Sequence, residues 1–265
     1  MTTNRSGYQI VLHKYGDVLY SGVKSTLKKY VEGLRDLIMK KTDETFLEEL
    51  LAQWDKHRTA VGMVRDILMY MVRFFFINWT WTIFINNQLQ DRNYVPQQKK
   101  TPVFDLGIKL FGQEVFHKAT LDRIQRLIMS IIRKDRDGEV VADRFLLKNL
   151  SQMMLEISKK DIYIPCFENK FLEESRDYFL REAAAFFEKS TATEYLQRVL
   201  QRRKEEQDRA ARCLDADTKP KIEDVIKDVM IESYKHRIIE KEGSGCIVML
   251  QDWRLDDLKL VFEVL

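Results

Sequence analysis

Histidine side chains are the first candidates for metal binding or acid–base chemistry in this chain. None of the four belongs to an HExxH motif, and none stands beside a pair of cysteines. Zinc sites and zinc-dependent hydrolases need such spacing. One of them, His57, falls on the apolar side of a predicted helix, so we expect it to pack between helices. The four are His13, His57, His117 and His236.

Cysteine is the next candidate, as a nucleophile, a metal ligand or a disulfide partner. The chain has three, Cys166, Cys213 and Cys246, which lie far apart and form no CxxC pair. An odd, scattered set argues against a disulfide framework or a zinc site, and it is typical of a reducing compartment.

Phosphate-binding and nucleophile loops are also missing from the sequence. It contains no GxSxG, no Walker loop and no GxGxxG motif. The glycine-bearing stretch Glu242–Cys246 has no basic P-loop residue after it and predicts a turn that ends a helix. We therefore predict no catalytic, cofactor or metal site. An enzyme with a concealed site stays open as an alternative, to be indicated by a pocket of converging, perturbed titratable groups.

The composition describes the elements that would position any such residues. Of the 265 residues, 45% are hydrophobic and 32% are charged, and only 10 glycines and 4 prolines interrupt the chain. So few helix breakers favour long helices. The 44 basic and 41 acidic residues nearly balance. A nucleic-acid binder would show a basic excess or stripe, so no nucleic-acid partner is expected.

Helical periodicity appears in most of the chain. In 43–71, leucines, valines and Trp54 recur every three or four residues. The segment 191–214 opens with a capping box, Thr191 to Glu194. No alternating strand pattern occurs, so the predicted fold is all-α. Further helices are expected at 8–32, 104–133, 140–158, 168–189 and 221–240, with a polar break at 133–138.

One segment does not fit this pattern. Residues 72–90 read VRFFFINWTWTIFINNQLQ, and the apolar run from Phe74 to Ile85 is too short to cross a bilayer. No membrane partner is expected.

Three groups of residues carry a resemblance to a known family. The first is Tyr8–Gly22 (YQIVLHKYGDVLYSG), and the second joins Trp54-x-x-His57 to Met63–Met71 (MVRDILMYM). Gly138–Val141, Cys213–Asp215 and Gly243–Leu250 follow in the same order. Their order and spacing are similar to those of cullins, especially the cullin-3 type.

This resemblance implies a fold and a function. Cullins are elongated stacks of five-helix cullin repeats, so we expect a first, N-terminally truncated repeat in 1–138 and a second repeat with the start of the next in 139–265. The resemblance implies a non-catalytic scaffold of a cullin-RING ubiquitin ligase, in the cytoplasm or nucleus. Its N-terminal region would dock a BTB-domain substrate adaptor. The RING protein and Nedd8 would bind only a full-length form. The competing interpretation is an unrelated helical-repeat interaction module.

The resemblance also implies the adaptor-binding residues. By position they are Tyr8, Leu12 and Tyr15 in the early helix and Tyr70 at the end of the signature helix. Tyrosine suits such a face, because it buries a large area at low entropic cost and keeps a polar tip.

The chain departs from the family pattern in three places. A helix expected before Tyr8 is missing, and the chain stops at Leu265, before any RING-binding region. Residues 72–90 separate the two halves of one family motif, Met69–Met71 and Asp91–Pro96, and removing them restores it in frame. Our hypothesis is that they are a translated short intron, which sequencing the transcript would test. The alternative is a hydrophobic loop that binds a partner.

Overall fold

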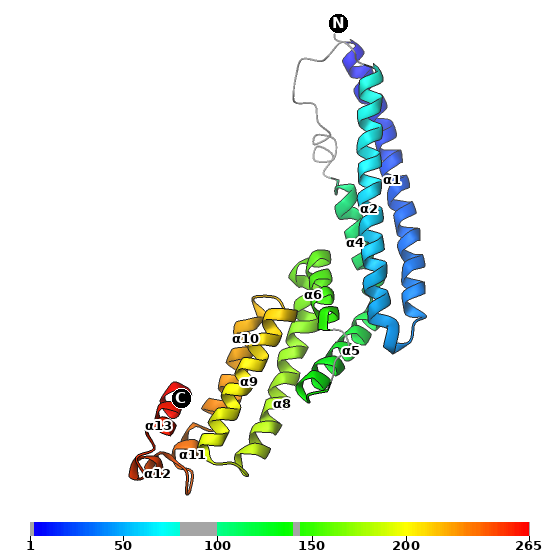
Figure 1. Ribbon diagram of the computed structural model, residues 1–265. Helices are drawn as coiled ribbons and strands as arrows, with labels where there is room; N and C mark the ends of the chain where they lie inside the picture. Colours follow the sequence, from blue (N-terminus) through cyan, green and yellow to red (C-terminus); the bar gives the residue numbers. More distant parts are fainter. Residues whose placement is uncertain (1–2, 80–99, 140–143, 265) are drawn as a thin grey trace. The chain divides into compact units, whose positions relative to one another are not determined.

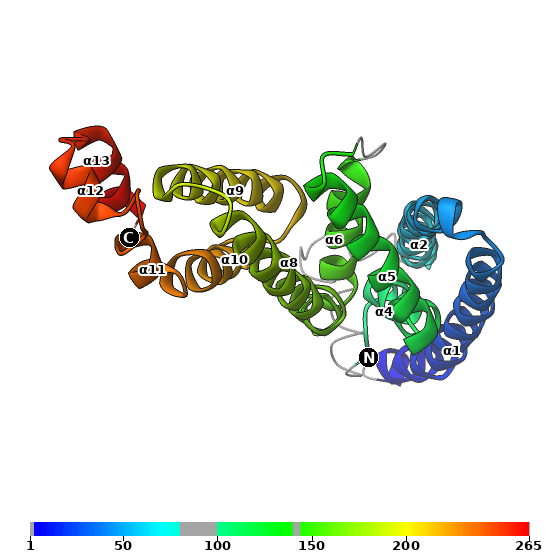
Figure 2. The ribbon, with the colours of Figure 1, turned by 90° about the horizontal axis from the view of Figure 1, so that it is seen from below.

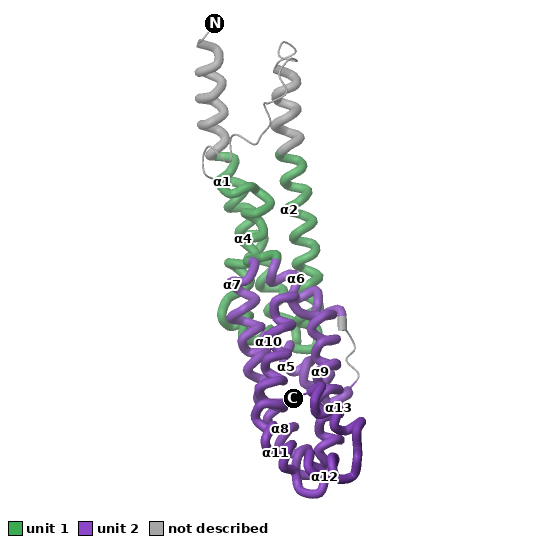
Figure 3. Tube along the Cα trace, turned by 90° about the vertical axis from the view of Figure 1, so that its left-hand side faces the viewer, with its two compact units in different colours: residues 1–124, 156–158 green, residues 125–155, 159–265 purple. Residues whose placement is uncertain are grey.

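The chain folds into helices in two compact units. The computed structural model describes the backbone of residues 3–79, 100–139 and 144–264, and the side chains of 18–68, 100–139 and 145–264. No strand occurs among these residues, so the all-α prediction is confirmed. Unit 1 comprises 1–124 with 156–158, and unit 2 comprises 125–155 with 159–265 (Figure 3).

Unit 1 is built on a long helical hairpin. The helices α1 and α2 run antiparallel on either side of a short turn, and α4 packs on both of them (Figure 1). Asp43 and Glu44 lie in the first turn of α2, where carboxylates favour the positive end of the helix dipole. The helices are α1 (Thr3–Met39), α2 (Asp43–Trp79), α4 (Val103–Val115) and the first part of α5 (Lys118–Arg136).

The interior of unit 1 is apolar and aromatic. One cluster joins Leu27 of α1, Val61 of α2 and Leu110 of α4, with Tyr20 and Phe104 packed against it. Below it the α2 stripe that the sequence predicted is buried and meets Phe111 of α4. The buried members of that stripe include Phe46, Leu47, Leu50, Trp54, His57 and Val61.

Unit 2 consists of shorter helices that pack on α8, α9 and α10, which lie beside one another in Figure 2. The capping box at the start of α9 is present as predicted, since the Thr191 hydroxyl accepts from the amide of Glu194, whose side chain accepts from the amide of Thr191. The elements are the rest of α5, α6 (Arg144–Ser158) up to Leu155, α7 (Lys160–Tyr163), the π-helix η1 (Ile164–Glu168), α8 (Asn169–Phe187), α9 (Ala192–Cys213), α10 (Thr218–Ile226), the π-helix η2 (Lys227–Glu232), α11 (Lys235–Ile239), α12 (Cys246–Gln251) and α13 (Leu255–Val264).

Two predicted helices are interrupted. The helix expected at 104–133 breaks at Phe116, which leaves helical geometry (φ −86°, ψ 55°) and packs its ring on Phe111. The helix expected at 221–240 widens into η2 and then turns at Ser233 and Tyr234. In η2 the Met230 carbonyl accepts a hydrogen bond of 2.8 Å from the buried Tyr195 hydroxyl, a tertiary contact that periodicity does not reveal.

The break predicted at 133–138 begins later than expected, because α5 continues to Arg136. Gly138 follows with φ +82°. The amide of Glu139 donates to the Lys134 carbonyl, and the amide of Gly138 donates to the Asp135 carbonyl. This is a Schellman ending, which needs a residue that tolerates positive φ. The assignment of repeats to 1–138 and 139–265 stays a prediction.

Residues 72–90 are described only in part. The backbone of 72–79 continues α2, and 80–90 lie outside the described residues. The intron hypothesis stays a prediction.

Candidate protein interface

The predicted contact residues of the early helix lie on one face of α1. It is unbroken from Thr3 to Met39, so positions 8, 12, 15 and 19 follow one another at steps of four, three and four residues. Such steps place residues on one face of a helix. The side chains of Tyr8, Leu12 and Tyr15 lie outside the described residues. Leu19, the next position on this face, is 48% exposed.

Helix α2 carries a second apolar stripe. Met63 is 60% exposed and Ile67 is 57% exposed, and Tyr70 follows three residues after Ile67. The buried residues His57 and Val61 belong to the opposite side of the helix. The side chain of Tyr70 also lies outside the described residues. The predicted position Tyr70 therefore extends a face that is apolar and uncovered where it is described.

The hairpin brings the two stripes to the same end of unit 1. Leu12 lies 27 residues before the end of α1 at Met39, and Tyr70 lies 27 residues after the start of α2 at Asp43. Because α1 and α2 run antiparallel (Figure 1), these two positions are equally far along their helices from the turn that joins them.

Two aromatic residues that pack where α4 meets α1 and α2 were not singled out by the sequence analysis. Tyr20 of α1 and Phe104 at the start of α4 are half-buried, and the Tyr20 hydroxyl donates to the Thr101 carbonyl at 2.9 Å. The Lys100 ammonium lies 5.1 Å from the Tyr20 ring centroid, and the Arg65 guanidinium lies 5.5 Å from that of Phe104. Both distances fit cation–π contacts. Tyr20 belongs to the first family motif, but no sequence signal pairs it with a residue 81 positions away.

His57 holds the helices beneath these residues together. It is fully buried, and its Nε2 lies 3.0 Å from the Gly107 carbonyl oxygen on α4. The Tyr30 ring of α1 stacks on it at 5.9 Å, and Phe111 of α4 lies 5.1 Å away. Burial lowers the pKa of His57 and outweighs the Gly107 hydrogen bond, which raises it. A neutral ring with Nε2–H donating to Gly107 fits this site. The expectation that His57 packs between helices is confirmed.

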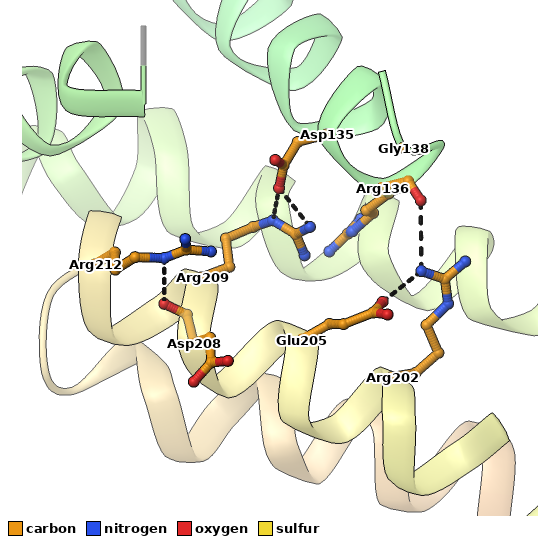
Figure 4. Close-up of a pocket in the computed structure, with 8 residues that line it drawn as sticks. All are labelled: Asp135, Arg136, Gly138, Arg202, Glu205, Asp208, Arg209 and Arg212. Atoms are coloured by element: carbon orange, nitrogen blue, oxygen red, sulfur yellow. Dashed lines mark hydrogen bonds and ion pairs between the residues drawn. The ribbon is translucent and has the colours of Figure 1, made fainter. Parts of the chain in front are cut away.

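A polar pocket of about 240 Å³ lies in unit 2 (Figure 4). Arg136 donates to Glu206, Arg202 to Glu205, and Arg209 to both Glu206 and Asp135. Guanidiniums remain protonated and these already bind carboxylates, so the arrangement suits a structural network better than acid–base chemistry. The lining residues are Asp135, Arg136, Gly138, Arg202, Glu205, Asp208, Arg209 and Arg212.

Within the described residues, no cluster of three or more histidine, cysteine or acidic side chains could hold a metal ion. Across the same ranges, every helix is too short or too polar to span a membrane.

The described residues define an all-α protein with no strand among them. A family model described as the Cullin alpha solenoid domain matches residues 1–265. The chain therefore belongs to the cullin family.

Curated relatives give the type of cullin that the chain is similar to. It is 34% identical over 263 residues to Cullin-3 of Dictyostelium discoideum, and the aligned region covers 98% of this chain and 32% of the relative. It is 32% identical over 261 residues to Cullin-3A of Arabidopsis thaliana, covering 98% of this chain and 33% of the relative. For Cullin-3 of Caenorhabditis elegans the identity is 29% over 266 residues, covering 98% and 32%. The chain thus spans about a third of the length of these relatives.

Proposed function

We propose that this chain is a scaffold region of a cullin-RING E3 ubiquitin ligase and that unit 1 docks a BTB-domain substrate adaptor. The similarity to three proteins named Cullin-3 over 98% of the chain carries the proposal. The resemblance of the chain to the cullin-3 type is what implies a BTB-domain adaptor. Membership of the cullin family excludes the competing interpretation of an unrelated helical-repeat module.

The docking face in this proposal consists of the two stripes at one end of the hairpin. On α1 it uses Tyr8, Leu12 and Tyr15 and continues to Leu19. On α2 it uses Tyr70 and continues to Ile67. Tyrosine is enriched among the residues that dominate binding energy at protein interfaces. The exposure of Leu19 and Ile67 supports this choice of face.

A scaffold role explains why no catalytic residue is needed in the chain. In this proposal the chain is not an enzyme, and a recruited ubiquitin-conjugating enzyme performs the chemistry. The RING protein and Nedd8 bind a full-length form, and the site of action is the cytoplasm or the nucleus. No nucleic acid, membrane, metal or cofactor is a partner in the proposed function.

The direct test is a pull-down of the chain with a panel of purified BTB-domain proteins. Tyr8→Ala and Tyr70→Ala are each expected to weaken binding about tenfold or more, because interface tyrosines are frequent hot spots. Phe262→Ala is the matched control, since Phe262 is an aromatic residue of unit 2 that is 87% exposed. Binding by no member of the panel, either to this chain or to a protein that lacks residues 72–90, would contradict the proposed face, and so would equal weakening by Phe262→Ala.

A second protein lacking residues 72–90 separates the face from the insertion. If only this shorter protein binds BTB-domain proteins, the insertion obstructs the adaptor face. If both bind equally, it lies clear of that face.

A further inference from the structure

The glycine-bearing turn between α11 and α12 reaches back to the turn between α8 and α9. At one end of it, the Lys241 ammonium donates to the carbonyl of Phe187, the last residue of α8, and lies 3.9 Å from the centroid of the Phe187 ring. At the other end, the Ser244 hydroxyl accepts a hydrogen bond of 3.1 Å from the amide of Ala192, the first residue of α9. One short segment thus satisfies backbone groups that two helix ends leave without a partner inside the helix.

The shape of this segment depends on its two glycines. Gly243 has φ +71°, a conformation that other residues adopt only at a cost. A Cβ added at Gly245 would lie 2.5 Å from the Ile239 carbonyl oxygen and 2.7 Å from that of Lys241. The amide of Gly245 donates to the same Lys241 carbonyl at 2.7 Å. The segment is therefore folded tightly, and Ser244 within it is only 5% exposed.

Helix α12, which follows this segment, buries little surface of its own. Of its six residues only Met249 is buried, whereas Ile247 and Leu250 are 65% and 62% exposed. A helix this short is not stable through its own hydrogen bonds. It packs on α13, which in turn packs on α9. The place of α12 therefore depends on the segment before it and on α13.

We propose that residues 241–245 are a clasp that locks α12 and α13 onto the α8–α9 turn, and that the charge of Lys241 keeps the clasp closed. The Lys241 ammonium contacts a carbonyl oxygen and the face of a ring, and both attract a cation. The nearby Glu188 carboxylate accepts from Arg237. In a scaffold, such a clasp sets the direction of α13. The inference goes beyond the proposed function and does not depend on a partner.

The test measures hydrogen exchange of single amides by NMR in the full chain. Lys241→Met removes the charge and the donor but keeps an unbranched side chain, whereas Lys241→Arg keeps both. The Ala192 amide bonds Ser244 and not Lys241, so it reports on the clasp as a whole. We expect it to exchange about fivefold faster or more in K241M and within about twofold of the natural rate in K241R. Lys259→Met is the matched control and should leave the rate unchanged, since Lys259 is 80% exposed on α13.

Exchange at the centre of α9, near Val199, separates opening of the clasp from unfolding of unit 2. It should be the same in K241M as in the natural chain. A folded K241M with unchanged exchange at Ala192 overturns the inference. Equal acceleration at Ala192 and Val199 also overturns it, because Lys241 would then support the whole unit.

A second variant covers the case in which K241M does not fold. Ser244→Ala removes the acceptor of the Ala192 amide and leaves Lys241 in place. If the clasp closes as a unit, the amides of Met249 and Leu250 in α12 exchange severalfold faster in S244A, while exchange at the centre of α9 does not change. Exchange in α12 equal to that of the natural chain overturns the inference.

Discussion

The interiors of the two units are packed around different kinds of polar group. In unit 1 the helices meet around a single neutral imidazole, His57, among aromatic rings. In unit 2, α5, α8 and α9 meet around an ionic cluster in which Arg136 and Glu206 are each 2% exposed. The Arg136 guanidinium donates twice to Glu206 and once to the Ser175 hydroxyl, and it lies 5.2 to 5.4 Å from the ring centroids of Phe171, Tyr178 and Phe179.

Each interior tolerates a different kind of change. A neutral ring in an apolar site resists gaining a charge, and a buried carboxylate among guanidiniums resists losing one. Unit 1 should therefore be sensitive to mild acid and to changes of shape. Unit 2 should be sensitive to the removal of one charge from a matched set.

The largest expected effect comes from breaking the ionic cluster. Glu206→Gln leaves Arg136 and Arg209 buried without their shared carboxylate, and we expect a loss of about 3 to 5 kcal/mol in the free energy of unfolding. Urea denaturation followed by circular dichroism measures it. The control is Glu205→Gln on the same helix, whose side chain is 35% exposed and whose loss costs about 1 kcal/mol or less. Equal costs for the two variants would contradict the account of unit 2.

A change of shape should be the most damaging in unit 1. Gly107→Ala drives a Cβ into Val61, and we expect a cost of about 1 to 3 kcal/mol. Gly62→Ala is a matched control one helix away, because a Cβ there meets no atom within 4 Å. It should stabilise the chain by about 0.5 to 1 kcal/mol through its helix propensity. Thermal unfolding measures both variants. A shift of the midpoint in the same direction for both would contradict the claim that α2 and α4 approach closely because residue 107 is glycine.

The two units should lose stability at different pH values as the solution is made acidic. The folded-state pKa of His57 is lowered, so below its ordinary value of 6.5 the unfolded chain takes up the proton first and stability falls, by at most about 1.4 kcal/mol per pH unit. Burial raises the pKa of Glu206, but Arg136 and Arg209 outweigh it and the pKa is lowered. Stability from Glu206 is therefore lost only below its ordinary value of 4.5. Hydrogen exchange between pH 7 and 5 should show loosening confined to unit 1 and absent in H57F. Loosening of unit 2 first would argue against both assignments.

The smallest effect is expected for an ion pair at the surface. Arg237 and Glu188 are 53% and 69% exposed, so Glu188→Gln should cost less than about 1 kcal/mol. A cost similar to that of Glu206→Gln would show that burial is not what distinguishes the ionic cluster.

Periodicity predicted the fold class, the buried stripe of α2 and the capping box of α9, because these depend on neighbours within one helix. It failed at Phe116 and Met230, where a ring and a carbonyl leave the helical pattern to meet residues elsewhere in the chain. The ionic cluster could not be predicted from the sequence either, since Arg136 and Glu206 are 70 positions apart and each is typical of a solvated helix face. For the docking face, the family motifs suggested Tyr8 and Tyr70, but the contact of Tyr20 with α4 needed a structure.

Unit 1, and not unit 2, carries the partner-binding face in the proposed function, and a hydrogen-exchange footprint of the complex can distinguish the two. The chain is mixed with a BTB-domain protein that it binds, and exchange is compared with that of the free chain. The account predicts protection at the start of α1, at the end of α2 beyond Met63 and at the start of α4. Protection confined to the helices of unit 2, such as α12 and α13, would contradict it.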